Sequence, residues 1–230
     1  MRQFSWELTA LITEEINSMD SVINYIMARL IILPGILVGL SFHEFGHAWV
    51  SYKLGDPTPK AQGRVSLNPG AHLDIIGFIA LLLLGFGWGK PVEINPAYYR
   101  HRRRDEMLVA FAGVFNNLII AIATAAVMKL LYVLAPEFIA SRTGSVIWQI
   151  LIGMLQINIV LMLFNLIPLP PLDGFGIVTQ IFKLDRYSWY PRFYQLGPMF
   201  LLLIIVFNLT DIILTPQVSW LYNFITGLFF

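Results

Sequence analysis

Two histidines and a glutamate lie inside a run of aromatic and small apolar residues, "SFHEFGHAWV" (residues 41–50). Side chains four residues apart project from the same face of a helix, so His43 and His47 can offer imidazole nitrogens to one ion. Glu44 lies beside them, where a carboxylate can take a proton from water that the ion acidifies. The spacing H-E-x-x-H therefore indicates a metal centre with hydrolytic chemistry. The alternative is a pair of core histidines and a glutamate that faces a neighbouring helix.

Composition sets these three residues in a membrane. Of the 230 residues, 57% are hydrophobic and 13% are charged, against roughly a quarter charged in soluble domains. We therefore expect an all-α integral membrane protein, in contact with a lipid bilayer. A charged group at the bilayer centre costs roughly 2.5 to 3.5 kcal/mol on insertion scales, so buried ionisable residues indicate function and favour the metal hypothesis. The net charge of +1 argues against a nucleic-acid partner.

A catalytic zinc ion usually takes three protein ligands, and a chain without cysteine must supply them from histidine and carboxylate. The strongest candidate for the third ligand is Asp173 in "LFNLIPLPPLDGF", where three prolines break a helix and a glycine follows the carboxylate. A proline-rich helix exit with an aspartate in a turn also fits this sequence. Asp56, His72 and Asp74 are weaker candidates.

Apolar runs define the elements that must position these side chains. They predict about four full transmembrane helices, at residues 30–52, 107–128, 143–172 as far as its prolines, and 193–210. Segment 75–88 is uncharged but too short to cross, which favours a re-entrant or short hairpin segment. Residues 1–28 have apolar side chains at helical spacing and predict an N-terminal amphipathic helix. Residues 29–230 then form a single membrane-embedded domain.

Lysine and arginine gather in two loops, residues 53–104 and 183–192. Short cytoplasmic loops are enriched in these residues, so both loops are predicted to be cytoplasmic in a multi-pass protein, in the cell membrane if the source is prokaryotic. A true crossing at 75–88 would put basic clusters on opposite faces. The charge distribution therefore supports a re-entrant segment there.

Several motifs in order resemble the site-2 protease family of intramembrane zinc metalloproteases, in particular its small prokaryotic members. "HEFGH" (43–47) is similar to the family's zinc helix, and "NLIPLPPLDG" (165–174) to the motif that supplies its third ligand. Between them, "GRVSLNPGAHLD", "FGWGKPVEINP" and "FAGVFNNL" resemble segments of one subgroup. Val114 stands where the family often has proline, and Asn117 matches its asparagine. The resemblance covers residues 30–180, and no segment resembles a PDZ or CBS domain.

The resemblance implies a zinc endopeptidase. Its Zn²⁺ ligands would be His43, His47 and Asp173, with Glu44 as the catalytic base. The substrate would be a transmembrane segment of another membrane protein, which must unwind locally because a helix hides its carbonyls in internal hydrogen bonds. The sequence leaves the identity of the substrate, its cleavage position and the oligomeric state open.

Five further residues are candidates for substrate binding. Asn117 and Asn165 lie in apolar runs where an unpartnered amide is costly, so they could hold the substrate backbone or the transition-state oxyanion, or bond to other helices. Trp88, Lys90 and Pro91 belong to an irregular loop that could pair with an unwound substrate by strand addition. The alternative is a loop anchored at the membrane interface by Trp88 and Lys90.

Two other classes of protein share part of this pattern. An inactive metal-binding scaffold would need the ligands without the base, and the presence of Glu44 disfavours this alternative. A metal-ion transporter would need polar residues along a path through several spans, whereas the mid-span acids here are essentially Glu44 alone.

Overall fold

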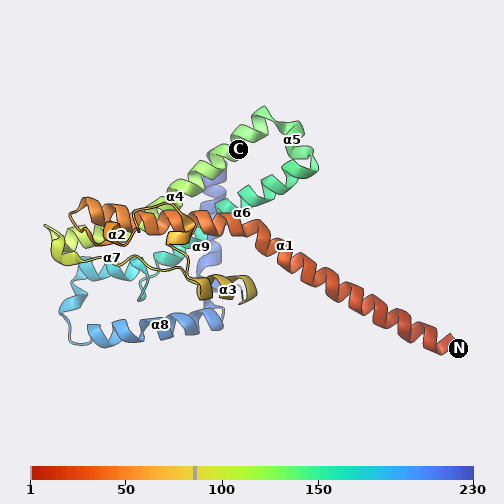
Figure 1. The fold of residues 1–230 in the computed structure, drawn as a ribbon, viewed down its shortest axis with the longest axis horizontal. Coiled ribbons are helices and arrows are strands. Elements are labelled where there is room, and N and C mark those ends of the chain that lie inside the picture. The colour runs from red at the N-terminus through yellow and green to blue at the C-terminus, as the bar shows by residue number, and fades with distance from the viewer. Residues whose placement is uncertain (1, 85–86) are drawn as a thin grey trace.

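The computed structural model describes the backbone of residues 2–84 and 87–230, and side chains from residue 26 onward except 82, 84–86 and 211. Its α-helices, labelled in Figure 1, are α1 (Arg2–Lys53), α2 (Thr58–Ala61), α3 (Ile75–Leu84), α4 (Arg102–Leu134), α5 (Pro136–Ala140), α6 (Arg142–Asn165), α7 (Asp173–Phe182), α8 (Tyr190–Val206) and α9 (Leu209–Gly227). Three short 3₁₀ turns, η1 (Pro69–Ala71), η2 (Pro96–Tyr98) and η3 (Leu184–Arg186), lie between them. Residues 2–84 and 87–230 contain no strand.

Three helices within the described residues are long and apolar enough to cross a membrane: Ile26–Lys53 of α1, α4 and α6. They pack against one another in pairs and form the centre of the molecule. The prediction of an all-α membrane protein is confirmed. The fourth predicted span, α8, is apolar but shorter, with 17 residues, because the chain turns at Asn208 in a left-handed conformation (φ 52°).

Close helix packing depends on glycines of α1. A Cβ atom added at Gly35 would lie 2.8 Å from the Met154 Cα atom of α6, and one at Gly46 would lie 2.8 Å from the Ala112 carbonyl oxygen of α4. Small residues let transmembrane helices approach this closely, where dispersion forces drive their association. The approach brings the "HEFGH" turn of α1 directly against α4.

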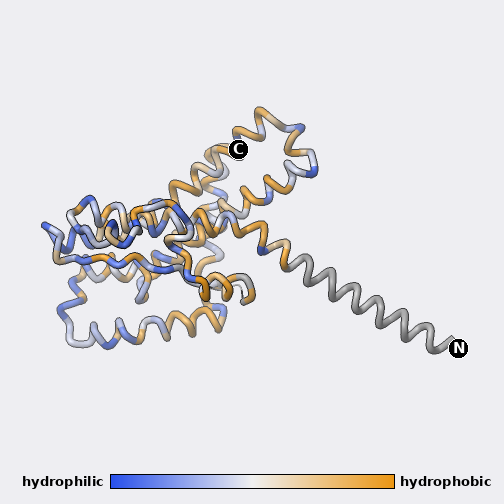
Figure 2. The backbone as a smooth tube through the Cα atoms, viewed as in Figure 1, coloured by the Kyte–Doolittle hydropathy of each residue, from blue (hydrophilic) through white to orange (hydrophobic). Residues whose placement is uncertain are grey.

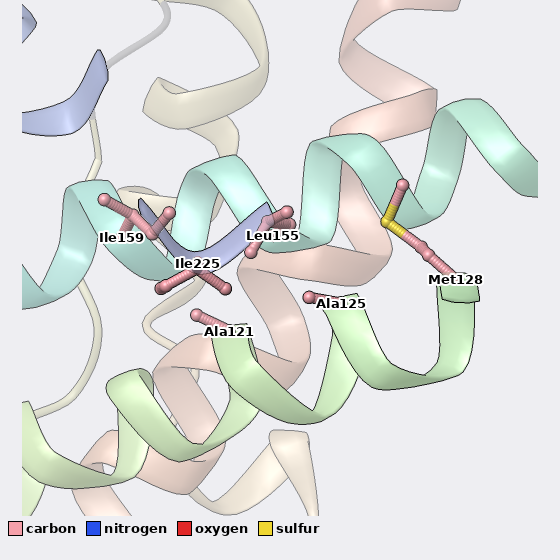
Figure 3. Packing of buried hydrophobic residues seen from close by; sticks show 6 residues of the cluster. All are labelled: Ala121, Ala125, Met128, Leu155, Ile159 and Ile225. Atoms are coloured by element: carbon pink, nitrogen blue, oxygen red, sulfur yellow. The ribbon is translucent and has the colours of Figure 1, made fainter. Parts of the chain in front are cut away.

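An apolar core fixes α4 and α6 relative to each other (Figure 3). It consists of Ala121, Ala125 and Met128 from α4, Leu155 and Ile159 from α6, and Ile225 from α9. On α4 the core begins at Ala121, about one helical turn after Asn117, which contacts the "HEFGH" turn. The core therefore sets the relative position of α4, α6 and α9 next to the "HEFGH" turn.

Hydrophilic residues gather at one end of the bundle, where α1 ends, α4 begins and α7 leads into α8 (Figures 1 and 2). The two basic loops meet there, because Arg103 Nη2 donates to both carboxylate oxygens of Asp185 at 3.0 Å. The loops thus lie on one side, as the charge distribution predicts. Their assignment to the cytoplasm stays a prediction.

The residues on either side of segment 75–88 lie next to each other. Leu73 and Gly89 form an antiparallel bridge, and the Lys90 N–H donates to the His72 carbonyl at 2.8 Å. Helix α3 has ten residues and a length of about 15 Å, which is about half of a full span. This agrees with a re-entrant or hairpin segment.

An amphipathic helix is predicted at residues 1–28, but most side chains of this segment lie outside the described residues. The backbone of α1 continues through residue 28 as one helix. The amphipathic character of this segment and the division at residue 28 stay predictions.

Candidate metal centre

Two elements supply the predicted ligands. His43 and His47 lie on consecutive turns of α1, and Asp173 is the first residue of α7. The prolines end α6 at Asn165, and residues 166–172 turn the chain back toward α1. A Cβ atom at Gly174 would lie 2.2 Å from the Leu166 carbonyl oxygen, so only glycine allows this turn to close. The tight turn explains why the carboxylate of residue 173 points into the bundle.

Three ligand atoms converge between α1 and α7. The Nε2 atoms of His43 and His47 are 3.0 Å apart, and they lie 3.2 and 3.3 Å from Asp173 Oδ2. Around a tetrahedral zinc ion with bonds of about 2.0 to 2.1 Å, neighbouring ligand atoms are about 3.3 Å apart. The observed triangle has the size of one face of such a tetrahedron.

Hydrogen bonds fix which ring nitrogen of each histidine faces this centre. His47 Nδ1 lies 2.7 Å from the Val109 carbonyl oxygen, which can only accept, so Nδ1 carries the proton. His43 Nδ1 lies 2.8 Å from Asn117 Oδ1. In both rings, Nε2 is left with a lone pair directed at the centre.

A chain of buried amides sets the orientation of Asn117. Its Nδ2 group donates to the Gly39 carbonyl and to Asn158 Oδ1, both at 3.0 Å, and Asn158 Nδ2 donates to the Met154 carbonyl at 2.9 Å. Because the carbonyls can only accept, each amide has one possible orientation and the Asn117 oxygen must face His43. Both asparagines are fully buried. Helices α6 and α4 thus hold a ligand of α1 in place.

These donor atoms fit a cation. Two imidazole lone pairs and a carboxylate oxygen face one another, and Asp173 Oδ2 is buried without a hydrogen-bond donor among the described residues. Lone pairs at 3.0 to 3.3 Å repel unless a positive charge lies between them. Imidazole and carboxylate ligands with oriented outer hydrogen bonds are those that zinc takes in catalytic sites.

Gly113 of α4 packs directly on the two imidazoles. A Cβ atom there would lie 2.6 Å from His47 Nε2 and Cε1 and 2.7 Å from His43 Cε1. These separations are far below van der Waals contact. Only glycine at residue 113 lets α4 cover the rings.

A cavity of about 520 Å³ opens beside the three ligands and Glu44. Glu44 is on the cavity wall, and its Oε2 atom accepts a hydrogen bond from the Val92 N–H at 3.0 Å. The rest of the wall combines the prolines, aromatic rings and polar groups of residues Pro91, Val92, Ile94, Glu106, Val109, Ala110, Asn165, Pro171, Leu172, Phe175, Gly176, Thr179, Gln180, Tyr190 and Tyr194. A carboxylate next to a metal triad in an accessible cavity can accept and return protons.

The candidate substrate-binding residues fall into two groups. Asn165 and Pro91 line the cavity, whereas Asn117 is buried behind His43 and Trp88 and Lys90 are exposed outside the lining. Asn117 therefore supports a ligand from behind. Their roles toward substrate stay predictions.

The weaker ligand candidates serve the loops instead. Asp56 and His72 are fully buried and bond to neighbouring loop groups, and Asp74 Oδ1 accepts from the Gly77 N–H at 2.8 Å and caps α3. None joins the group formed by the two histidines and Asp173.

Sequence reasoning missed Gly113, the Val109 carbonyl, and the cavity wall from α7 and α8. A glycine inside an apolar span is a signal of close helix approach, and it could have drawn attention to residue 113. A backbone carbonyl leaves no signal in the sequence, since every residue has one. The tyrosines of α8 look like ordinary interface residues.

Asn117→Leu is expected to lower zinc affinity by about 10- to 100-fold, because His43 Nδ1 loses the oxygen that orients the ring. Competition with a chelating dye on detergent-purified protein measures the affinity. Asn165→Leu is the matched control, since its amide contacts no ligand, and it should bind zinc as the wild type does. Unchanged affinity for Asn117→Leu would show that packing alone orients His43.

Comparison with known proteins finds similar proteins with related names, of which three are described. The chain is 42% identical over 147 residues to "Putative zinc metalloprotease YwhC" of Bacillus subtilis, a match that covers 64% of this chain and 66% of the relative. "Putative zinc metalloprotease Rip2" of Mycolicibacterium smegmatis is 26% identical over 162 residues, covering 67% and 58%. The Rip2 of Mycobacterium tuberculosis strain H37Rv is 25% identical over 198 residues, covering 84% and 73%.

The chain spans about two thirds or less of the first two relatives. No family model and no solved structure matches it. The relatives' names and the grouping of His43, His47 and Asp173 together support Zn²⁺ as the ion of this site. This chain, which combines the metal group with three membrane-length helices within the described residues, is thus similar to proteins that are named as zinc metalloproteases.

Proposed function

We propose that the chain is an intramembrane zinc metalloprotease of the site-2 type, which hydrolyses peptide bonds within or near transmembrane segments of other membrane proteins. One observation carries this proposal: three metal-ligating atoms and the Glu44 carboxylate share one cavity within a bundle of membrane-length helices. The names of the relatives support the protease activity.

The residues of this cavity have separate tasks in peptide hydrolysis. Zinc held by His43, His47 and Asp173 would supply a Lewis acid that polarises a peptide carbonyl and acidifies water. Glu44 takes a proton from the attacking water and delivers it to the nitrogen of the departing amine. The amide chain through Asn117 and the Val109 carbonyl keep both imidazoles in place during these steps.

The depth of the centre supports cleavage near one membrane surface. His47 lies six residues before Lys53 at the end of α1, about 9 Å along the helix axis, and Val109 lies seven residues after the start of α4. A full span is about 30 Å. The substrate's helix end is thus the part that reaches the metal, and it must unwind to expose a carbonyl.

The cavity suits an unwound apolar segment. Leu172, Phe175 and Tyr194 give it apolar walls, and Asn165 adds an amide that can bond to substrate backbone. Transport stays the weaker alternative, because the described residues hold one group of three such side chains, at His43, His47 and Asp173, and a path would need further groups along the bundle.

Metal removal tests the proposal. Purified protein in liposomes, incubated with a transmembrane peptide, is expected to release two fragments. Chelation should reduce the rate at least 100-fold, and a stoichiometric addition of Zn²⁺ should restore it, since the Lewis acid is required for attack. A soluble unstructured peptide serves as the control for specificity. Wild-type protein that carries zinc and leaves a panel of transmembrane peptides intact would favour the inactive scaffold.

A further inference from the structure

Several ionisable side chains among the described residues are buried outside the metal centre, and three of them lie between α1 and α3. Asp56 and His72 are 0% exposed and Arg64 is 6% exposed, although all three lie in the predicted cytoplasmic segment 53–104. The proposed hydrolysis uses none of them. Burial of such groups is costly unless each is bonded, so their partners indicate what the burial accomplishes.

Asp56 holds one end of the loop segment formed by residues 90–95. Its Oδ2 atom accepts from the Asn95 N–H at 2.7 Å and from the Ser51 hydroxyl at 2.9 Å, and its Oδ1 accepts from the Thr58 N–H at 2.9 Å. Burial raises the pKa of Asp56, but these donated hydrogen bonds outweigh it and the pKa is lowered. Residue 95 is thus tied through a charged carboxylate to the end of α1.

Arg64 and His72 hold the other end. Arg64 Nη1 donates to the Ala71 carbonyl and, at 3.3 Å, to the Lys90 carbonyl. The Lys90 N–H donates to the His72 carbonyl at 2.8 Å. His72 Nε2 in turn lies 2.8 Å from the Ser66 carbonyl. Residue 90 is therefore fixed on both its N–H and its carbonyl.

Val92 lies between these two anchors, and its N–H points at Glu44 Oε2 at 3.0 Å. The bond joins residues 48 positions apart in sequence, on α1 and on the loop. A hydrogen bond to a carboxylate is charge-assisted and restrains a flexible side chain. It engages one oxygen of Glu44 and leaves Oε1 for the attacking water.

We infer that the backbone N–H of Val92 is a positioning group for Glu44, and that the buried Asp56, Arg64 and His72 form the scaffold that presents it. The inference rests on the proposed function. A Glu44 side chain in the wrong rotamer cannot reach the water near the metal. A donor that is held in place therefore raises the fraction of molecules in which Glu44 has the reactive rotamer.

Val92→Pro tests this directly, because proline removes the N–H, and residues 91–95 lie outside any helix or strand. The kcat for the transmembrane peptide is expected to fall about 10- to 100-fold, with KM and zinc content unchanged. Val92→Ala is the matched control, since it also loses most of the side chain but keeps the N–H, and the kcat of Val92→Pro should lie about 10-fold or more below that of Val92→Ala. Equal kcat values for Val92→Pro and Val92→Ala would overturn the inference.

A double-mutant cycle separates positioning from general damage to the loop. Glu44→Asp shortens the carboxylate by one methylene and takes it out of reach of the Val92 N–H. In that background Val92→Pro should lower the residual kcat less than about twofold, since the bond is already lost. An equal fold-loss in both backgrounds would show that the proline acts through another contact and would contradict the inference.

The scaffold has its own test, which does not alter the segment at residue 92. Asp56→Asn replaces one acceptor oxygen by a donor, so one of the three N–H and O–H donors loses its partner. We expect about a fivefold fall in kcat at unchanged zinc content. A wild-type rate for Asp56→Asn would show that this carboxylate does not help to position the Val92 N–H. Failure of wild-type protein to cut any transmembrane peptide would count against the proposed function instead, because every comparison here is made relative to wild-type cleavage.

Discussion

Glu44→Gln is expected to lower the rate of peptide cleavage by about 10³- to 10⁴-fold while the protein keeps its zinc. General acid–base catalysis contributes about 10²- to 10⁴-fold in enzymes, and here one carboxylate serves both the attacking water and the departing amine. Glutamine has nearly the same shape and can still accept from the Val92 N–H through its amide oxygen. Helix packing should therefore be unaffected.

The measurement combines zinc content by atomic emission with cleavage of a transmembrane peptide in liposomes. Asp173→Asn is the complementary variant, because it should lose both zinc and cleavage. The two variants separate loss of the base from loss of the metal. A Glu44→Gln protein that cuts at the wild-type rate would exclude Glu44 as the base. A variant that loses zinc would show that Glu44 is needed for metal binding.

Gly113→Ala is expected to abolish zinc binding and, with it, cleavage by at least 100-fold. Alanine is favoured over glycine inside a helix by about 1 kcal/mol, so local helix stability should rise. The added methyl group, however, would lie 2.6 to 2.7 Å from both imidazoles. The rings have no room to retreat, because His43 is tied to Asn117 and His47 to the Val109 carbonyl. Either α4 moves away or a ligand leaves the centre.

A helical glycine with free space around it provides the control. A Cβ atom at Gly227 of α9 would meet no atom within 4 Å. Gly227→Ala should therefore keep wild-type zinc content and cleavage. Zinc binding in the Gly113→Ala protein at wild-type affinity would mean that α4 can shift without cost and that its contact with the imidazoles is loose.

Sequence alone determined the local part of the centre. His43, Glu44 and His47 share one short stretch of helix, and helix geometry places residues four apart on one face in any protein. Composition placed that helix in a membrane, where buried ionisable groups are expensive enough to indicate function. Asp173 was within reach of sequence reasoning because the prolines and Gly174 limit what the backbone can do there.

Only the tertiary structure decided what surrounds these residues. Asn117 is 74 residues from His43, and the Val92 N–H is 48 residues from Glu44. Such contacts depend on how α1, α4 and the loop pack, and backbone groups such as the Val109 carbonyl carry no residue-type signal. Helix spacing reports which side chains share a face, whereas the partner of that face is set by the sum of many weak packing contacts. For that reason the convergence of the three candidate ligands could be predicted from the sequence, and the groups that orient them could not.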